Sequence, residues 1–145
     1  MNTILSDEEY NYIYKRVPRV NVEVVMKTEN GVVLIKRDIE PWKDYWHLPG
    51  GRIRMDETLE DAVKRISLYE AGVEVSVVRM IGCVVYPSIK QQEGFGWPVG
   101  IAFLVDIDGG TLCGSEFGEE IKEFTKLPRR IIKEQKEFLE LNRLV

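Results

Sequence analysis

The chain has 145 residues, a length that predicts one compact domain over residues 1–145 with a real hydrophobic core. Hydrophobic residues make up 44% and charged residues 30%, an ordinary globular composition that excludes a disordered or fibrous protein. The formal net charge of -4 argues against a domain that wraps nucleic acid, so an anionic ligand needs local cations.

The N-terminal segment, residues 1–17, mixes charged and aromatic side chains and lacks the apolar core of a signal peptide. Ser6 and Glu9 have the spacing of a capping box, which predicts a short helix. No apolar run approaches the roughly twenty residues that span a bilayer. Cys83 and Cys113 show neither metal-ligand spacing nor a dense disulfide pattern, so we expect both to be reduced. These features predict a cytoplasmic protein without a membrane partner.

Valine-rich or alternating segments mark the expected strands. Five segments share this character: residues 20–26, 32–37, 46–48, 73–86 and 99–107. In the first, apolar residues alternate with Asn21 and Glu23. The pair Asn30 and Gly31 then predicts a hairpin turn, because both residues tolerate positive φ. Residues 87–98 are polar and predict a loop.

Two further helices are expected beyond the N-terminal one. Asp56 or Thr58 can cap the first, which runs to Ala71. Gly72 ends it, because glycine accepts the left-handed conformation that follows many helices. Pro128 suits the first position of the second, an amphipathic helix at the C-terminus.

Glu70 is an unusual residue for its place on the first of these helices. At helical spacing it continues the apolar stripe of Leu59, Val63 and Ile66, which must face the protein interior. An inward carboxylate costs several kcal/mol, to order of magnitude, and the helix dipole disfavours negative charge in the last turn. A bound cation would compensate both penalties. A buried salt bridge to Arg65 or another arginine, or fraying of the helix end, would do so as well.

The turn before this helix has the character of a phosphate site. Gly50 and Gly51 allow close approach of ligand atoms to the backbone, and the turn leads towards a helix N-terminus that favours anions. Arg37 and Arg52 flank the turn in sequence, and a guanidinium group suits bidentate contact with phosphate. The alternative is an ordinary tight turn with solvated arginines.

A longer motif spans the turn and the helix. It reads Gly51-x5-Glu57-x7-Arg65-x4-Glu70-x-Gly72-Val73 and resembles the Nudix box, G-x5-E-x7-R-E-U-x-E-E-x-G-U with U aliphatic. Ile66 and Tyr69 stand where the box has glutamates, and Ser67 where it has an aliphatic residue. These departures weigh against ordinary multi-metal cleavage of a phosphoanhydride. The resemblance implies the Nudix fold, an α/β/α sandwich with a mixed β-sheet.

One Nudix branch, the GDP-mannose mannosyl hydrolases, is similar to this chain over about residues 20–75 and likewise keeps only the last glutamate. This resemblance implies that the carbonyl of Gly50 and the carboxylate of Glu70 bind one Mg²⁺. Arg37 and Arg52 would bind the diphosphate, and Arg52 would also face the charge that develops during catalysis. The branch attacks the anomeric carbon of the nucleotide sugar with water and releases GDP, and it is implied to form a homodimer.

The branch also has a Gln-His pair after the last strand, as metal ligand and general base, and this chain has neither residue there. Glu116 could replace the metal ligand, and Glu119 or Glu120 the base, because carboxylates can do both. A solvated acidic loop explains the same residues equally well. We expect His47, the only histidine, to be a hydrogen-bonded structural residue of the sheet.

Three functions follow from these patterns. The leading hypothesis is an Mg²⁺-dependent hydrolase that splits a nucleoside diphosphate sugar, GDP-mannose-like, into sugar and nucleoside diphosphate. The second is a Nudix-fold nucleotide-binding domain with little or no catalysis. The third is an enzyme that cleaves the diphosphate itself.

Overall fold

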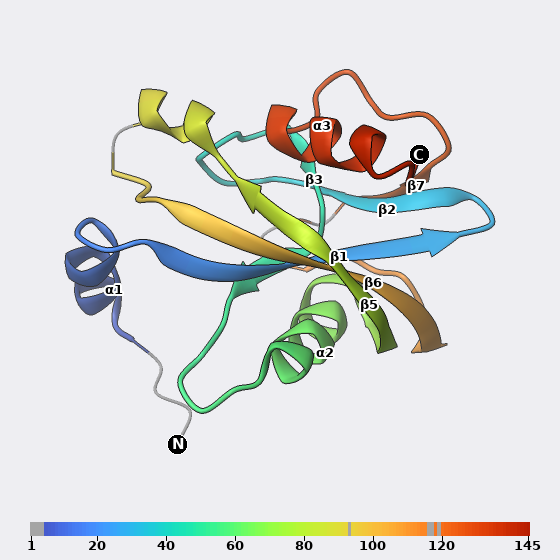
Figure 1. Ribbon diagram of the computed structural model, residues 1–145, viewed down its shortest axis with the longest axis horizontal. Helices are drawn as coiled ribbons and strands as arrows, with labels where there is room; N and C mark the ends of the chain where they lie inside the picture. The colour runs from blue at the N-terminus through green and yellow to red at the C-terminus, as the bar shows by residue number, and fades with distance from the viewer. Residues whose placement is uncertain (1–4, 93, 116–117, 119) are drawn as a thin grey trace.

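The computed structural model describes residues 5–92, 94–115, 118 and 120–145 (Figure 1). Its elements follow in the order α1 (Asp7–Tyr14), β1 (Arg19–Thr28), β2 (Gly31–Lys36), β3 (Trp46–His47), β4 (Gly50–Arg52), α2 (Leu59–Ala71), β5 (Val73–Val85), the 3₁₀ helix η1 (Pro87–Gln91), β6 (Pro98–Gly110), β7 (Ile121–Phe124) and α3 (Lys133–Leu141).

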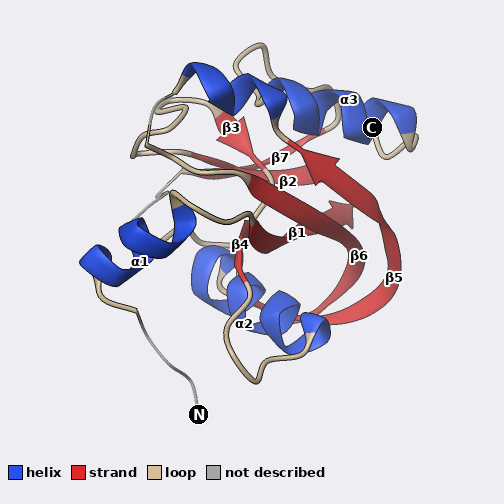
Figure 2. Cartoon of the chain, turned by 60° about the vertical axis from the view of Figure 1, so that its left-hand side comes forward, coloured by secondary structure: helices blue, strands red, loops and turns tan. Residues whose placement is uncertain are grey.

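The strands form one mixed sheet in the order β3-β2-β1-β6-β5, with β4 added to β1 and β7 added to β2. Strands β1 and β6 are parallel, and the other pairs are antiparallel. Helix α2 lies on one face of the sheet and α3 on the other (Figure 2). The predicted α/β/α sandwich with a mixed sheet is therefore confirmed. No helix in the described part of the chain is long and apolar enough to cross a bilayer.

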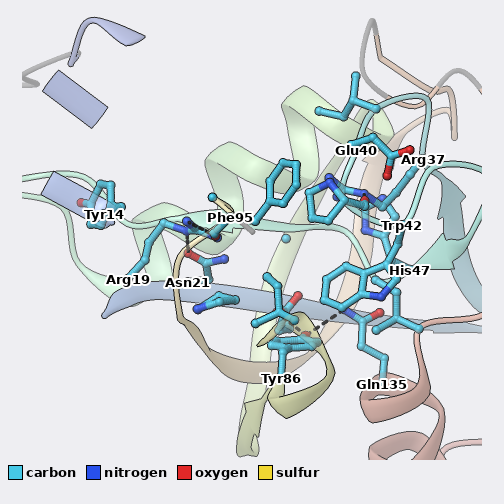
Figure 3. A pocket seen from close by; sticks show the side chains of 18 of the residues that line it. Tyr14, Arg19, Asn21, Arg37, Glu40, Trp42, His47, Tyr86, Phe95 and Gln135 are labelled. Atoms are coloured by element: carbon cyan, nitrogen blue, oxygen red, sulfur yellow. Dashed lines mark hydrogen bonds between the residues drawn. The ribbon is translucent and has the colours of Figure 1, made fainter. Parts of the chain in front are cut away.

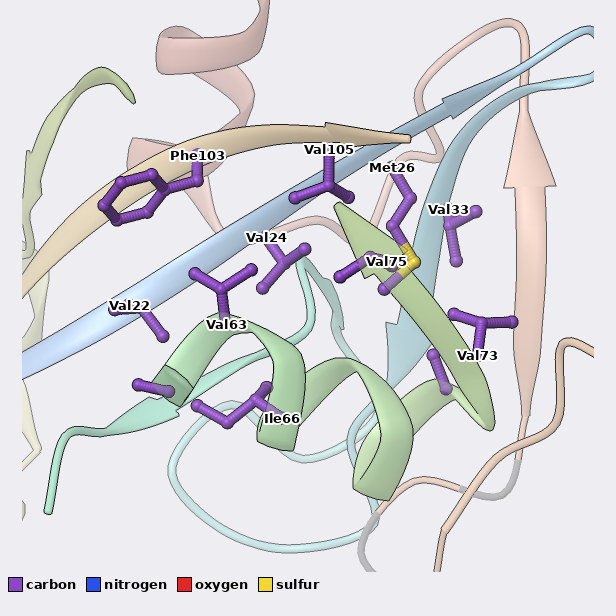
Figure 4. Packing of buried hydrophobic residues seen from close by; sticks show 12 residues of the cluster. Val22, Val24, Met26, Val33, Val63, Ile66, Val73, Val75, Phe103 and Val105 are labelled. Carbon is purple, nitrogen blue, oxygen red and sulfur yellow. The ribbon is translucent and has the colours of Figure 1, made fainter. Parts of the chain in front are cut away.

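Helix α2 is built as the sequence predicts. Thr58 is the N-cap residue and exchanges capping-box hydrogen bonds with Asp61, while Gly72 ends the helix in the left-handed conformation at φ 70°. The predicted apolar stripe faces the sheet: Val63 and Ile66 are buried in one cluster with valines of β1 and β5 (Figure 4). The burial of this stripe fixes the rotation of α2, and with it the direction of Glu70.

The C-terminal helix begins later than predicted. Pro128 is not its first residue, because α3 starts at Lys133. The preceding backbone is extended and hydrogen-bonds to β3 instead: the N–H of Trp46 donates to the carbonyl of Arg130 at 2.7 Å, and the N–H of Ile132 donates to the carbonyl of Trp46 at 3.1 Å. Those backbone groups cannot also form helical hydrogen bonds, so the helix starts after them.

Several smaller expectations were wrong or incomplete. The segment taken as a glycine turn forms β4, the loop over residues 87–98 contains η1, and β7 had no predicted counterpart. These pieces are short and are held by partners distant in sequence, so local pattern is a weak guide to them. The capping box at Ser6 and Glu9 is confirmed, and Cys83 and Cys113 are both free and exposed.

Strand β1 has two different antiparallel neighbours along one edge, so the sheet is divided at that edge. Near the hairpin turn β1 pairs with β2, through Lys27 and Thr28, whereas at its other end it pairs with β4, through residues 21–23. The outer half of β2 leads to Arg37 and, through a loop, to β3. Polar side chains from β1, α2 and the start of this loop therefore meet the backbone of β4 at the division.

Candidate active site

Glu70 lies in the last turn of α2 and turns back to the start of β4. Its carboxylate accepts a hydrogen bond from the N–H of Gly50 at 3.0 Å. Burial raises the pKa of this carboxyl group to about 7, although the Gly50 hydrogen bond and the positive charges of Arg37 and Arg65 oppose that rise. The side chain is thus directed inward, as its place on the helix stripe predicts.

Arg65 does not neutralise Glu70 by a salt bridge. Its guanidinium forms two hydrogen bonds with the carboxylate of Glu57, at 2.7 and 2.8 Å, and a third with the carbonyl of Arg52 at 2.9 Å. The proposed Arg65–Glu70 salt bridge is therefore wrong. Glu57 also accepts from the N–H of Arg54, so the pair braces the loop between β4 and α2. These contacts place Glu57 and Arg65 in support of this loop.

Glu23, one of the polar residues of the alternating pattern in β1, is the second acidic residue of the site. It is only 5% exposed on the central strand β1. Burial raises its pKa to about 8; the hydrogen bond from Tyr86 opposes the shift and the charge of Glu70 adds to it. The one signal in the sequence was Val25, an apolar residue two positions further on and therefore on the same face of the strand as Glu23.

Gly50 has a packing reason for its missing side chain. A Cβ atom there would collide with the carboxylate of Glu23 and would lie 2.8 Å from the carbonyl oxygen of Val22. Gly100 of β6 meets Glu23 from the other side, with its hypothetical Cβ 2.6 Å from Cγ. The two glycines make room for a buried glutamate, so Gly50 brings β4 close to both Glu23 and Glu70.

Arg37 follows β2 and supplies positive charge to this corner. Its Nε donates to the carbonyl of Pro41 at 2.6 Å, which orients the guanidinium. Burial lowers the pKa of Arg37, while the charges of Glu70 and Glu23 raise it. One cation thus interacts with both buried carboxyl groups.

A cavity of about 380 Å³ opens beside these residues (Figure 3). Its wall combines polar groups of the site with aromatic residues of other elements: Glu23, Arg37, Gly50, Trp42, Tyr86 and Phe95. Glu70 lines a second, smaller cavity of about 150 Å³. This cavity shares Arg37, Ile39 and His47 with the first. The two cavities adjoin at Arg37, with a buried carboxyl group in each.

Arg52 lies outside both cavities. Its Nη1 donates to the carbonyl of Ile53 at 3.3 Å. The guanidinium stacks against α1, with its Cζ 5.8 Å from the ring centre of Tyr10 and 5.7 Å from that of Tyr14. Of the two arginines predicted to bind phosphate, the structure brings only Arg37 to the carboxyl groups.

The sequence matches the NUDIX domain family over residues 17–127. The chain belongs to the Nudix family. Among its relatives, the low-salt glycan biosynthesis protein Agl8 of Haloferax volcanii is 39% identical over 80 residues, covering 55% of this chain and 51% of that protein. An ADP-ribose pyrophosphatase of Methanocaldococcus jannaschii is 34% identical over 107 residues, covering 74% and 62%. The chain thus spans between half and two thirds of the length of these relatives.

The fold of this Nudix domain matches solved structures over most of its length. A MutT NUDIX hydrolase from Burkholderia pseudomallei superposes with a TM-score of 0.77 at 24% identity, covering 86% of this chain and 98% of that one. The likeness at this identity concerns the fold, and the seven-stranded mixed sheet described above agrees with it.

Of the three glutamates in the acidic loop that were candidates for metal ligand or general base, the structure describes only Glu120. Glu116 and Glu119 lie outside the described residues. Glu120 forms ion pairs with Lys122 at 2.7 Å and with Lys36 at 3.5 Å, and hydrogen bonding to Lys122 holds its pKa below the ordinary value. A carboxylate of that kind is a weak base, and Glu120 does not line either cavity.

His47 of the Nudix domain is the structural histidine that its place in β3 predicts. Its Nδ1 lies 2.6 Å from the carbonyl oxygen of Leu48. Burial, reinforced by the charge of Arg37, lowers its pKa to about 3. The imidazole is therefore neutral at ordinary pH and a poor general base.

The site fits a hard divalent cation in part. In residues 5–92, 94–115, 118 and 120–145, no cluster of three or more His, Cys, Asp or Glu could hold a metal by itself. Mg²⁺ in proteins is commonly bound by one or two carboxylates together with substrate phosphates. Two buried carboxyl groups of raised pKa, both near Gly50, meet that requirement, because a cation would relieve the cost of ionising them.

Proposed function

We propose that this Nudix domain is an Mg²⁺-dependent hydrolase that splits a nucleoside diphosphate sugar, GDP-mannose-like, into the sugar and a nucleoside diphosphate. The observation that carries the proposal is the meeting of Glu70, Glu23 and Arg37 beside Gly50, at the edge of a cavity of about 380 Å³. Cation-binding and phosphate-binding groups stand next to a chamber of the size that small-molecule ligands occupy.

The cavity wall suits a substrate with a ring on each side of a diphosphate. Arg37 can pair with phosphate oxygens, and Trp42, Tyr86 and Phe95 offer apolar faces to a base or a sugar. The Agl8 relative, named for glycan biosynthesis, supports a substrate that carries a sugar.

The chemistry divides among few groups. Glu70 and the backbone of Gly50 would hold Mg²⁺, which when bound supplies Lewis-acid stabilisation of the charge on the departing diphosphate. Arg37 neutralises further phosphate charge. Glu23, whose carboxylate lies against Gly50, would hold the same cation as Glu70, and the proton of the attacking water would pass to the solvent. In this scheme the bond from the anomeric carbon to oxygen breaks. Arg52 would act on the diphosphate only after leaving its place against α1.

Product analysis in ¹⁸O-labelled water tests the proposal. Purified protein with Mg²⁺ is incubated with a panel of nucleoside diphosphate sugars, and the products are identified by mass spectrometry. We expect free sugar that carries the label and unlabelled nucleoside diphosphate. An absence of turnover across the panel, in protein shown to be folded, would falsify the proposal.

A second candidate function is cleavage of the diphosphate, favoured by the similarity to the ADP-ribose pyrophosphatase. The same experiment separates it, because the label would then enter a phosphate product. The replacement of box glutamates by Ile66, which is buried in the core, and by Tyr69 favours a third, a nucleotide-binding domain without catalysis. Thermal stabilisation by the nucleotide without any product would support that function.

A further inference from the structure

A continuous chain of buried hydrogen bonds connects α3 to Glu23. The backbone N–H of Leu48 donates to Oε1 of Gln135 at 2.7 Å. Nε2 of Gln135 donates to the hydroxyl of Tyr86 at 2.9 Å, and that hydroxyl donates to Oε1 of Glu23 at 2.7 Å. Gln135, Tyr86 and Glu23 are each at most 5% exposed, so water does not compete for these groups. Figure 3 shows Tyr86 and Gln135 together in the wall of the cavity.

We call these three hydrogen bonds, from Leu48 through Gln135 and Tyr86 to Glu23, the relay. The N–H of Leu48 determines which atom is the donor in each of the other two hydrogen bonds. An N–H group can only donate, so the atom of Gln135 that faces Leu48 must be the amide oxygen. The amide nitrogen then faces Tyr86 and can only donate. Because the tyrosine oxygen accepts this hydrogen bond, its own proton is left for Glu23. The relay therefore keeps Oε1 of Glu23 an acceptor.

The other oxygen of Glu23 is the one that faces the site. Oε2 lies against Gly50, at the position that a side chain there would occupy. Gly50 in turn donates its N–H to Glu70. The relay begins at Leu48, only two residues before Gly50, and returns to Gly50 through Glu23. The peptide segment that carries Gly50 and the carboxylate beside it are thus tied to one another through α3.

The geometry points to Gln135 and Tyr86 as positioning residues, which hold one oxygen of Glu23 so that the other is presented to the cation beside Gly50 and Glu70. This inference rests on the proposed function and adds to it a requirement that lies outside the Nudix box, at the residue after β5 and on α3. It also explains why a polar glutamine is buried on the inner face of α3.

The test is a double-mutant cycle between Tyr86→Phe and Glu23→Gln. For the wild type, both single variants and the double variant, we measure the affinity for Mg²⁺ alone and kcat. Loss of a residue that orients a metal ligand costs about 10- to 100-fold in affinity or activity, so we expect Tyr86→Phe to lower both within that range. In the Glu23→Gln background the same change should have no further effect, because the group it positions is already gone. Gln135→Met should lower both quantities less than Tyr86→Phe does.

Leu139→Ala is the matched control. Leu139 is fully buried on the same helix and takes no part in the relay, so its loss should lower thermal stability without changing Mg²⁺ affinity or kcat. Effects of Tyr86→Phe and Glu23→Gln that multiply, or a Tyr86→Phe effect on stability alone, would overturn the inference. A wild-type protein that binds Mg²⁺ but turns over no nucleotide sugar overturns the proposed function, and the affinity cycle still decides the relay. A wild-type protein without Mg²⁺ binding overturns both.

Discussion

Two arginines of similar sequence context have different surroundings, and this difference predicts different mutational effects. Arg37 interacts with both buried carboxyl groups, whereas Arg52 stacks on α1. A hydrogen bond to a charged group contributes about 1.5–3 kcal/mol, so Arg37→Ala should lower kcat/KM about 10- to 100-fold. Arg52→Ala should lower it less than about threefold by the same reasoning. Steady-state kinetics on the two variants check this, and a larger loss in Arg52→Ala would contradict it.

Protonation of the two glutamates predicts an unusual dependence of stability on pH in protein treated with a chelator. The folded pKa values of Glu70 and Glu23, about 7 and 8, lie above the ordinary 4.5, so the folded state binds these protons more tightly. The contribution of the two glutamates to the free energy of unfolding is complete at low pH, and it is lost as the pH rises through their folded-state pKa values. His47, with a folded pKa of about 3, acts oppositely, but only below its ordinary value of 6.5.

Between pH 6.5 and 8.5 the glutamates therefore dominate. We expect the free energy of unfolding of chelated protein to fall over this interval, on the order of 2 kcal/mol. Urea unfolding at both pH values measures the change. Glu70→Gln should show a smaller fall, because one titrating group is removed. A free energy that rises with pH in chelated wild-type protein would show that the carboxyl groups are not buried as described.

The sequence predicted part of this site and missed another for a physical reason. Glu70 stood out because a helix gives each residue a direction, and the neighbouring apolar residues fixed which direction was inward. Glu23 did not stand out, because alternation in a strand leaves the second face open to water or to protein. In the folded protein Glu23 is a buried acid whose carboxylate accepts a hydrogen bond from Tyr86.

At the scale of elements, the residues that begin and end helix α2 lie within the helical segment or directly beside it. The hydroxyl of Thr58 accepts from the N–H of Asp61 at 3.0 Å, so Thr58→Ala should cost about 1 kcal/mol of unfolding free energy. Equilibrium urea denaturation measures this cost. Thr125→Ala, at an exposed bend, is the matched control and should change stability little. Equal losses in the two variants would mean that the cap does not stabilise the helix.

The contrast between α2 and α3 shows which elements a sequence can define. Helix α2 has its cap, stripe and terminating glycine within the chain segment itself. The start of α3 is set by Trp46, more than eighty residues earlier, because the backbone around Ile132 is bonded to that residue. Strand β4 depends on β1 in the same way. The sequence-based predictions were therefore wrong for the start of α3 and for β4, which depend on partners distant in the chain.

At the scale of the whole molecule, the resemblance to the mannosyl hydrolase branch predicts a homodimer. Within α1, Tyr10 and Tyr14 pack against each other with ring centres 4.8 Å apart, whereas Tyr12 is 64% exposed. An exposed aromatic residue of this kind suits an interface. We expect sedimentation at micromolar concentration to give the mass of a dimer, and Tyr12→Ser to weaken it. A monomeric wild type would contradict this prediction.

The parallel pairing of β1 with β6 has a consequence for the order in which the protein acquires its site during synthesis. Residues 19–26 pair with residues 98–105, so the central strands cannot join until most of the chain has left the ribosome. A nascent chain that ends after Val73 already carries the whole Nudix motif, but it lacks the partner strand, Tyr86 and Gln135. Glu23 would then have no donor for its carboxylate. The Nudix motif is translated early, whereas the hydrogen bonds that hold the acid beside it need residues that are translated later.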